Sequence, residues 1–287
     1  MKVKEIEIQN KWYPKQLRKI NNPPKKLYVL GNHEILNTDS LSIIGSRCCT
    51  SYGADMAREF ARKLAKKGIT IVSGMAKGID SNAHLGAIEA NGKTIAVLGS
   101  GFNHIYPDKE IYEKILKSGG AVITEYSENV GVSPQGFRDR NRIVAGLSLG
   151  TLVIEAKQRS GTGITANYVK RYKRKLFCIP HKIEDKSGVG TNRLLKKGAI
   201  LVTEVKDILQ YFKTIDNEEN TEKELEIEMS EEYRKIYEEI KRQTATAEEI
   251  SKKVKMSISD VNTILTMLEL EDYIQSLPGN HFQVKRC

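Results

Sequence analysis

The chain has 287 residues, enough to bury a sizeable core and to form one larger domain together with a smaller one. Its formal net charge is +10, and residues 216–232 hold nine acidic residues against one lysine, so the positive excess lies on residues 1–215. Such an excess points to an anionic partner, most often nucleic acid, although a lysine-rich protein need not have one. No apolar run suggests a signal peptide or a membrane span, so the sequence predicts a soluble, cytoplasmic protein without membrane contact.

Residues 1–40 read as a short lead-in segment, too small to be a domain. Residues 41–215 then alternate short, β-branched apolar runs with amphipathic helical patterns. The runs are Leu41–Ile44, Ile69–Val72, Thr94–Leu98, Ala121–Thr124, Thr151–Ile154, Leu176–Ile179 and Ile200–Val202. This alternation is typical of βαβ units, and it predicts an α/β fold with a doubly wound parallel sheet. We expect Gly68 to end the helix over 53–67 and Asp80 to cap the helix over 81–90.

Residues 216–232 read as an acidic linker, and residues 233–287 as a winged-helix domain. A helix over Tyr233–Ile240 is followed by the capping-box spacing Thr246-x-x-Glu249 and then by Ser257-x-x-Asp260, which opens a third helix. A hairpin about residues 277–280 completes the pattern. The third helix contains no Lys or Arg, so we hypothesise that this domain docks a protein or a sister subunit rather than DNA. Micromolar, strongly salt-dependent DNA binding by residues 230–287 alone would contradict this.

Residues 137–148 hold three arginines at i, i+2 and i+4, which only Asp139 offsets. A guanidinium group is always charged and suits phosphate oxygens, so this stretch predicts a polyanion site. Arg138 and Arg142 are expected to share a helical face, with Arg140 turned aside. Phe137 is the best candidate for stacking on a nucleobase, with burial at the start of the helix as the alternative. Tyr106-Pro107 is interpreted as shaping a loop.

Glycine, hydroxyl and basic residues recur where the predicted strands end. They are Gly45, Ser46 and Arg47 after the first strand, Ser73, Gly74, Lys77 and Gly78 after the second, and Lys157, Arg159, Ser160, Gly161, Thr162 and Thr165 after the fifth. Ligands bind beyond the carboxyl ends of parallel strands, so these loops together predict a phosphate site, although each loop alone fits ordinary turn geometry. Glu125 and Glu155 end strands at the same edge and are interpreted as orienting arginines or helix N-termini.

Signals for catalysis and for cofactors are weak. The cysteines Cys48, Cys49, Cys178 and Cys287 form no metal-binding or disulfide pattern, and His84 is interpreted as packing or capping. Neither a dinucleotide-binding glycine pattern nor a Walker motif occurs in the right context. We therefore expect no catalytic residue, no cofactor and no metal.

Several motifs in order resemble the DprA/Smf family of DNA-processing proteins: SIIGSR, IVSGMAKGIDSNAH, GKTIAVLGSGFNHIYP, RNRIVAGLS, LVIEA, SGTGITA and VGTNRLLKKGA. They cover about residues 40–205. The resemblance implies an extended Rossmann-like fold that binds single-stranded DNA, forms a homodimer and loads RecA recombinase, in support of natural transformation and DNA recombination. It implies DNA contacts from Arg47, Lys77, Phe137, Arg140, Arg142 and residues 160–165. The expected DNA-binding set is Gly45, Ser46, Arg47, Ser73, Gly74, Lys77, Gly78, Phe137, Arg140, Asn141, Arg142, Lys157, Arg159, Ser160, Gly161, Thr162 and Thr165.

This sequence departs from the family pattern at two positions: Arg138 stands where the family usually has proline, and His181 stands where relatives often have glycine. Two alternatives stay open. One is an enzyme that cleaves nucleoside monophosphates, although its Pro-Gly-Gly-x-Gly-Thr loop is missing and Gly161-Thr162-Gly163 is only a partial match. The other is a sensor of small nucleotides, for which mononucleotide binding would exclude DNA.

Overall fold

The computed structural model describes residues 2–158, 160–212, 231–270 and 273–284, and the chain divides into two compact units, Met1–Ile215 and Asp216–Cys287. The larger unit is built on a nine-stranded sheet with the order β1-β2-β6-β5-β4-β3-β7-β8-β9. Its strands are β1 (Lys4–Glu7), β2 (Lys26–Gly31), β3 (Ser40–Ile44), β4 (Thr70–Ser73), β5 (Thr94–Val97), β6 (Ala121–Thr124), β7 (Gly150–Val153), β8 (Lys175–Cys178) and β9 (Ile200–Leu201). The pairings among β3 to β9 are parallel, which confirms the predicted α/β fold.

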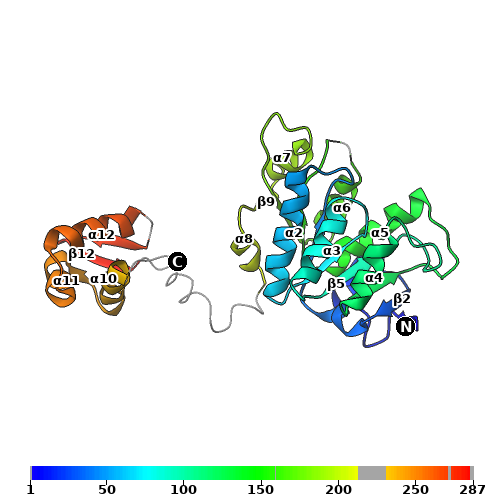
Figure 1. Ribbon diagram of the computed structural model, residues 1–287, viewed down its shortest axis with the longest axis horizontal. Coiled ribbons are helices and arrows are strands. Elements are labelled where there is room, and N and C mark those ends of the chain that lie inside the picture. The colour runs from blue at the N-terminus through cyan, green and yellow to red at the C-terminus, as the bar shows by residue number, and fades with distance from the viewer. Residues whose placement is uncertain (1, 159, 213–230, 271–272, 285–287) are drawn as a thin grey trace. The chain divides into compact units, whose positions relative to one another are not determined.

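Helices cover both faces of this sheet. They are α1 (Lys15–Arg18), the 3₁₀ helix His33–Asn37, α2 (Ser51–Lys66), α3 (Ile79–Glu89), α4 (Lys109–Lys117), α5 (Pro134–Leu147), α6 (Gly161–Arg171), α7 (Val189–Lys196) and α8 (Lys206–Leu209). Helices α2, α3 and α4 lie side by side on one face (Figure 1). Ile43 of β3 packs in the core beneath α2 and α3, whereas the adjacent Ile44 packs in the core beneath α5 and α6. Burial on both faces explains why these strands read as continuous apolar runs.

The lead-in segment contributes two strands that the sequence reading did not assign. β1 and β2 pair antiparallel, and β2 pairs antiparallel with β6, so the segment extends the sheet past its parallel part. Tyr13 anchors it, because its side chain is fully buried and its hydroxyl donates a hydrogen bond to the Pro24 carbonyl at 2.7 Å. β1 buries only Ile6, and such a short, mostly exposed edge strand has little signal in the sequence.

Helix α3 begins differently from the prediction. Gly78 is its N-cap, and Asp80 lies inside the first turn. The Asp80 carboxylate accepts hydrogen bonds from the backbone N–H groups of Gly74 at 3.1 Å and Ala76 at 3.4 Å, so it fixes the loop before the helix instead of capping it. Gly68 does follow α2, with a φ of +81° that suits glycine after a helix end.

The smaller unit is a winged helix, as predicted. It contains α10 (Glu231–Arg242), β10 (Ala245–Thr246), α11 (Ala247–Val254), α12 (Ile258–Leu270), β11 (Ile274–Leu277) and β12 (His281–Val284). Thr246 and Glu249 form the predicted capping box at α11. β11 and β12 form the hairpin, and β10 pairs with the other side of β12. Ile236, Ile250 and Leu265 are among the buried residues of its core.

His84 on α3 is fully buried, and its Nδ1 lies 2.7 Å from the Thr94 hydroxyl. Burial, reinforced by the charge of Arg140, lowers the pKa of His84 to about 3. An unfolded histidine titrates near pH 6.5, so the unfolded state binds one more proton than the folded state between these two values. Stability therefore falls as the pH falls through this range. From this residue we expect a loss of about 1.4 kcal/mol per pH unit.

Urea unfolding of the wild type and of His84→Leu at pH 7 and pH 5 checks this expectation. The variant loses the hydrogen bond to Thr94, and its stability should depend less steeply on pH than that of the wild type. Equal pH slopes for the two proteins would show that His84 does not contribute to acid sensitivity.

Candidate functional site

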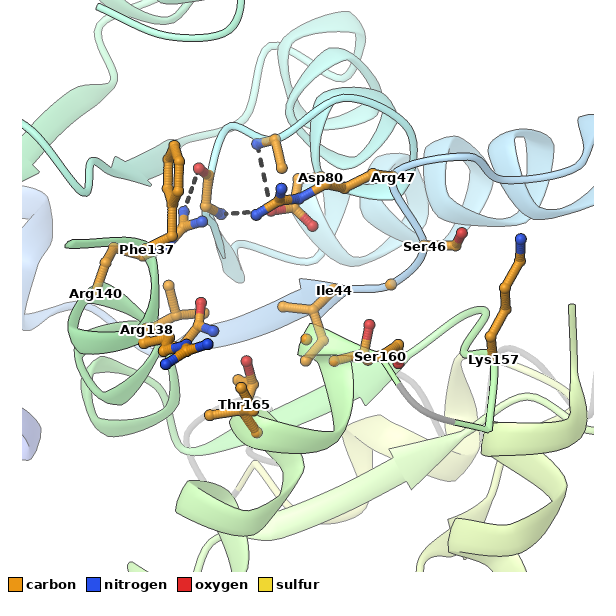
Figure 2. Close-up of a pocket in the computed structure, with 18 of the residues that line it drawn as sticks. Ile44, Ser46, Arg47, Asp80, Phe137, Arg138, Arg140, Lys157, Ser160 and Thr165 are labelled. Carbon is orange, nitrogen blue, oxygen red and sulfur yellow. Dashed lines mark hydrogen bonds between the residues drawn. The ribbon is translucent and has the colours of Figure 1, made fainter. Parts of the chain in front are cut away.

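A cleft of about 660 Å³ lies at the carboxyl edge of the parallel strands (Figure 2). It opens beside β3, which has β4 on one side and β7 on the other. Successive strands from β3 to β6 add on one side of β3, and those from β7 to β9 add on the other side, so the strand order switches at this point. Open α/β sheets bind ligands at such a switch point. The predicted site residues that line the cleft are Gly45, Ser46, Arg47, Gly74, Phe137, Arg140, Asn141, Lys157, Ser160, Gly161, Thr162 and Thr165.

Other predicted residues lie outside the cleft lining. The Ser73 hydroxyl is buried and donates to the Ile43 carbonyl at 2.6 Å, so it serves the sheet. Gly78 has a φ of +81°, and a Cβ there would lie 2.4 Å from the Ser46 carbonyl oxygen, so it permits two loops to approach. Lys77 is exposed on the β4–α3 loop without lining the cleft. Arg159 lies outside the described residues.

Arg142 also lies outside the cleft lining, so its predicted DNA contact stays a prediction. Its Nη2 donates to the Glu125 carboxylate, and the side chains of Arg142 and Glu125 are only 12% and 16% exposed. The carboxylate at the end of β6 therefore holds this arginine away from a ligand in the cleft. The interpretation of Glu125 as an arginine-orienting group agrees with this contact. Arg138, four residues earlier on α5, is exposed and does line the cleft.

Arg140 is buried at the floor of the cleft and does not extend into solvent. It is 4% exposed, and its Nη1 donates hydrogen bonds to the Gly74 carbonyl and, at 2.9 Å, to the Val97 carbonyl. Burial lowers the pKa of Arg140, and the buried carboxylate of Asp80 opposes that shift. Gly74 makes the contact possible, since a Cβ at that position would lie 1.8 Å from Nη1. Arg140 therefore joins α5 to the ends of β4 and β5.

Three exposed cations surround this floor. Arg47 comes from the β3–α2 loop, Arg138 from α5 and Lys157 from the β7–α6 loop (Figure 2). The Arg47 guanidinium lies over the ring of Phe137, 5.2 Å from its centroid. Arg138 was not in the set of DNA-binding residues predicted from the sequence. Its position as the first of the three closely spaced arginines was a signal by which it could have been found.

Two helix N-termini near the cleft differ in what occupies them. At α2, the fully buried Glu155 carboxylate accepts hydrogen bonds from the Thr50 hydroxyl and, at 3.1 Å, from the Thr50 backbone N–H. At α6, the N-cap Ser160 makes no capping hydrogen bond, and its hydroxyl oxygen is buried without a hydrogen-bond partner in the described part of the chain. Helix N-termini carry unpaired N–H groups and a dipole that favours negative charge. The N-terminus of α6 is therefore the one of the two that is free to bind an anion.

Two further findings concern metals and membranes. Among the residues that the structure describes, no group of three or more His, Cys, Asp or Glu side chains could hold a metal ion. Within the same residues, no helix is long and apolar enough to cross a membrane.

These features define a Rossmann-like protein with a cleft lined by basic side chains at its switch point and a separate winged-helix unit in the second part of the chain. The chain belongs to the DNA recombination-mediator protein A family, whose model matches residues 4–213, and residues 220–280 match the DprA winged helix domain. Protein Smf of Escherichia coli K12 is 34% identical over 98% of this chain and 78% of its own length. The DNA processing protein DprA of Streptococcus pneumoniae R6 is 37% identical over 74% of this chain and 75% of its own length.

Two solved structures are also similar. DNA processing protein A from S. pneumoniae aligns with a TM-score of 0.68 and 36% identity, over 73% of this chain and 74% of its own. The Helicobacter pylori protein aligns with a TM-score of 0.66 and 31% identity, over 75% of this chain and 97% of its own, and is described with a single-stranded DNA binding mode.

Proposed function

We propose that this protein binds single-stranded DNA in the cleft and, without enzymatic activity, presents the strand to RecA recombinase. The observation that carries the proposal is the open N-terminus of α6, where the buried Ser160 hydroxyl lacks a partner among the described residues and faces the cleft. A phosphate group fits this position, because helix N-termini bind oxyanions through backbone N–H groups.

The charges around the cleft support a strand rather than a single phosphate. Arg47, Arg138 and Lys157 reach the cleft from three different elements, so successive phosphates along a backbone can each meet a cation. Asp80 is the one carboxylate among the described lining residues, and it is buried against the loop that it fixes.

The aromatic ring at the cleft favours unpaired bases. Phe137 lines the cleft next to Arg47, and single-stranded nucleic acid is held by backbone charge together with base stacking on aromatic side chains. A duplex keeps its bases stacked on one another and cannot offer them to this ring. The related H. pylori protein, described with a single-stranded DNA binding mode, supports the same ligand for this chain.

Cys48 provides a direct test of where the strand lies. Its thiol is exposed and lines the cleft, whereas Cys49 is partly buried and Cys178 is buried. A single-stranded oligonucleotide at ten times its Kd should slow alkylation of Cys48 by N-ethylmaleimide about tenfold, by mass action. Peptide mass spectrometry separates the cysteines, and high salt, which releases the strand, is the control.

If saturating DNA leaves the alkylation rate of Cys48 unchanged, the strand does not lie in the cleft. Protection by a nucleoside monophosphate that also displaces DNA would favour the nucleotide-sensor alternative instead.

The wider role follows from the family. We propose that the whole chain forms a cytoplasmic homodimer. This homodimer loads RecA onto single strands in natural transformation and DNA recombination. RecA assembly on strands coated with single-strand-binding protein tests it, because the protein should shorten the delay before filaments form. A delay that is the same with and without the protein would reject the loading role while leaving DNA binding intact.

A further inference from the structure

A second exposed aromatic ring stands next to Phe137. Tyr106, in the loop between β5 and α4, is 50% exposed, and its ring centroid lies 5.8 Å from that of Phe137 with an angle of 49° between the rings. Tyr106 does not line the cleft itself. The two rings therefore continue the edge of the cleft onto the surface of the β5–α4 loop.

Phe137 has little free ring area of its own. It is half-buried, and the Arg47 guanidinium already lies over its ring, 5.2 Å from the centroid. A base that stacks on Phe137 must displace Arg47 or stack on the guanidinium. Tyr106 is the exposed member of this group, so it can accept a base without moving either neighbour.

The loop that carries Tyr106 is held in place. The Gly101 N–H donates to the Val130 carbonyl at 2.8 Å, and the Asn103 side chain donates to the Asn129 side chain at 2.7 Å. These bonds join the β5–α4 loop to the β6–α5 loop. An aromatic side chain on a fixed loop loses little conformational entropy when it binds, which favours its use as a contact.

We propose that Tyr106 is a nucleobase-binding site that extends the cleft. A base of the strand whose phosphates occupy the cleft stacks on the Tyr106 ring. The proposal rests on the proposed function and adds that the protein contacts bases, as well as phosphates, outside the cleft. It replaces the loop-shaping role that the sequence analysis gave to Tyr106-Pro107.

Fluorescence anisotropy with the full chain tests this site. Two labelled probes of equal length are compared, oligo(dT) and a chain of abasic sugar-phosphate units, against wild type, Tyr106→Ala and Tyr106→Phe. Tyr106→Ala should weaken oligo(dT) binding roughly 5- to 150-fold, the range for one stacked base. It should change abasic binding little, and Tyr106→Phe should keep the wild-type affinity for both probes.

Tyr211→Ala is the matched control, since Tyr211 is 37% exposed and contacts Lys175 at the amino end of β8, away from the cleft edge. Ultraviolet crosslinking of wild-type protein to iodouridine-labelled DNA gives a readout that needs no variant. A crosslink at Tyr106 supports the proposal, and crosslinks only at other residues overturn it.

The two proposals fail in different ways. If wild type binds oligo(dT) with a steep salt dependence but Tyr106→Ala binds it equally well, the base site is rejected and strand binding stands. If wild type binds neither probe, the proposed function fails, and the base site fails with it.

Discussion

Replacement of Arg140 by methionine is expected to lower the free energy of unfolding by about 3–5 kcal/mol, the range for breaking a buried charge network. The change removes the donor to the Gly74 and Val97 carbonyls and leaves the buried Asp80 without its nearby positive charge. Each buried acceptor that loses its partner costs about 1–3 kcal/mol. Urea unfolding followed by circular dichroism measures the difference.

Arg138→Met is the matched control on the same helix. Arg138 is exposed and lies two residues from Arg140, so its replacement should change stability by no more than about 0.5 kcal/mol. Equal losses in the two variants would mean that Arg140 is not the structural arginine described above.

The second large effect concerns DNA affinity. The double replacement Arg47→Ala and Lys157→Ala removes two exposed cleft cations, and each phosphate contact on a single strand contributes about 0.7 to the slope of log K against log salt. We expect the magnitude of that slope to fall by about 1.4, with weaker binding to every sequence. Titrations at several salt concentrations give the slope directly.

Lys114→Ala with Lys117→Ala removes the same charge from α4, where both lysines are exposed near the helix end. This control separates loss of a contact from loss of overall charge. A slope change of the same size in both double variants would remove Arg47 and Lys157 from the binding site.

The sequence predicted the parallel part of the sheet well, because strands buried on both faces have a strong apolar signal. It did not reveal β1, a short and mostly exposed edge strand, or β2, which pairs antiparallel between β1 and β6. The winged helix was also predictable from the sequence, since capping boxes and turn residues are local signals. These features depend on residues close to one another along the chain, so their patterns can be recognised in a single sequence.

The site was only partly predictable. The sequence predicted an anion site at the three arginines, but it did not reveal which of them lines the cleft. That choice depends on long-range partners: Arg140 bonds to Gly74, 66 residues away, and Arg142 pairs with Glu125, which directly follows β6. A side chain at the edge of a sheet can turn to solvent or to a buried acceptor, and only the packed fold decides between them.

The same limit applies to the helix N-termini. Glu155 and Ser160 lie five residues apart along the chain, and both follow β7. In the fold, Glu155 occupies the start of α2 while Ser160 leaves the start of α6 open. The open position for an anion therefore became clear only from the tertiary structure.

The docking role hypothesised for the winged-helix unit stays a prediction. Among the described side chains of α12, Asn262, Thr263 and Thr266 are exposed and uncharged, and Ile258 is 49% exposed. This surface lacks the cations that dominate DNA affinity, which is consistent with a protein partner.

One measurement tests the central claim most directly: binding of the full wild-type chain to a single strand and to a duplex of the same length, across a range of salt concentrations. The account predicts tighter binding to the single strand, with affinity that falls steeply as salt rises, because phosphates bind in the cleft and the aromatic rings at its edge need unpaired bases. Equal or tighter binding to the duplex, or affinity for the single strand that does not change with salt, would contradict it.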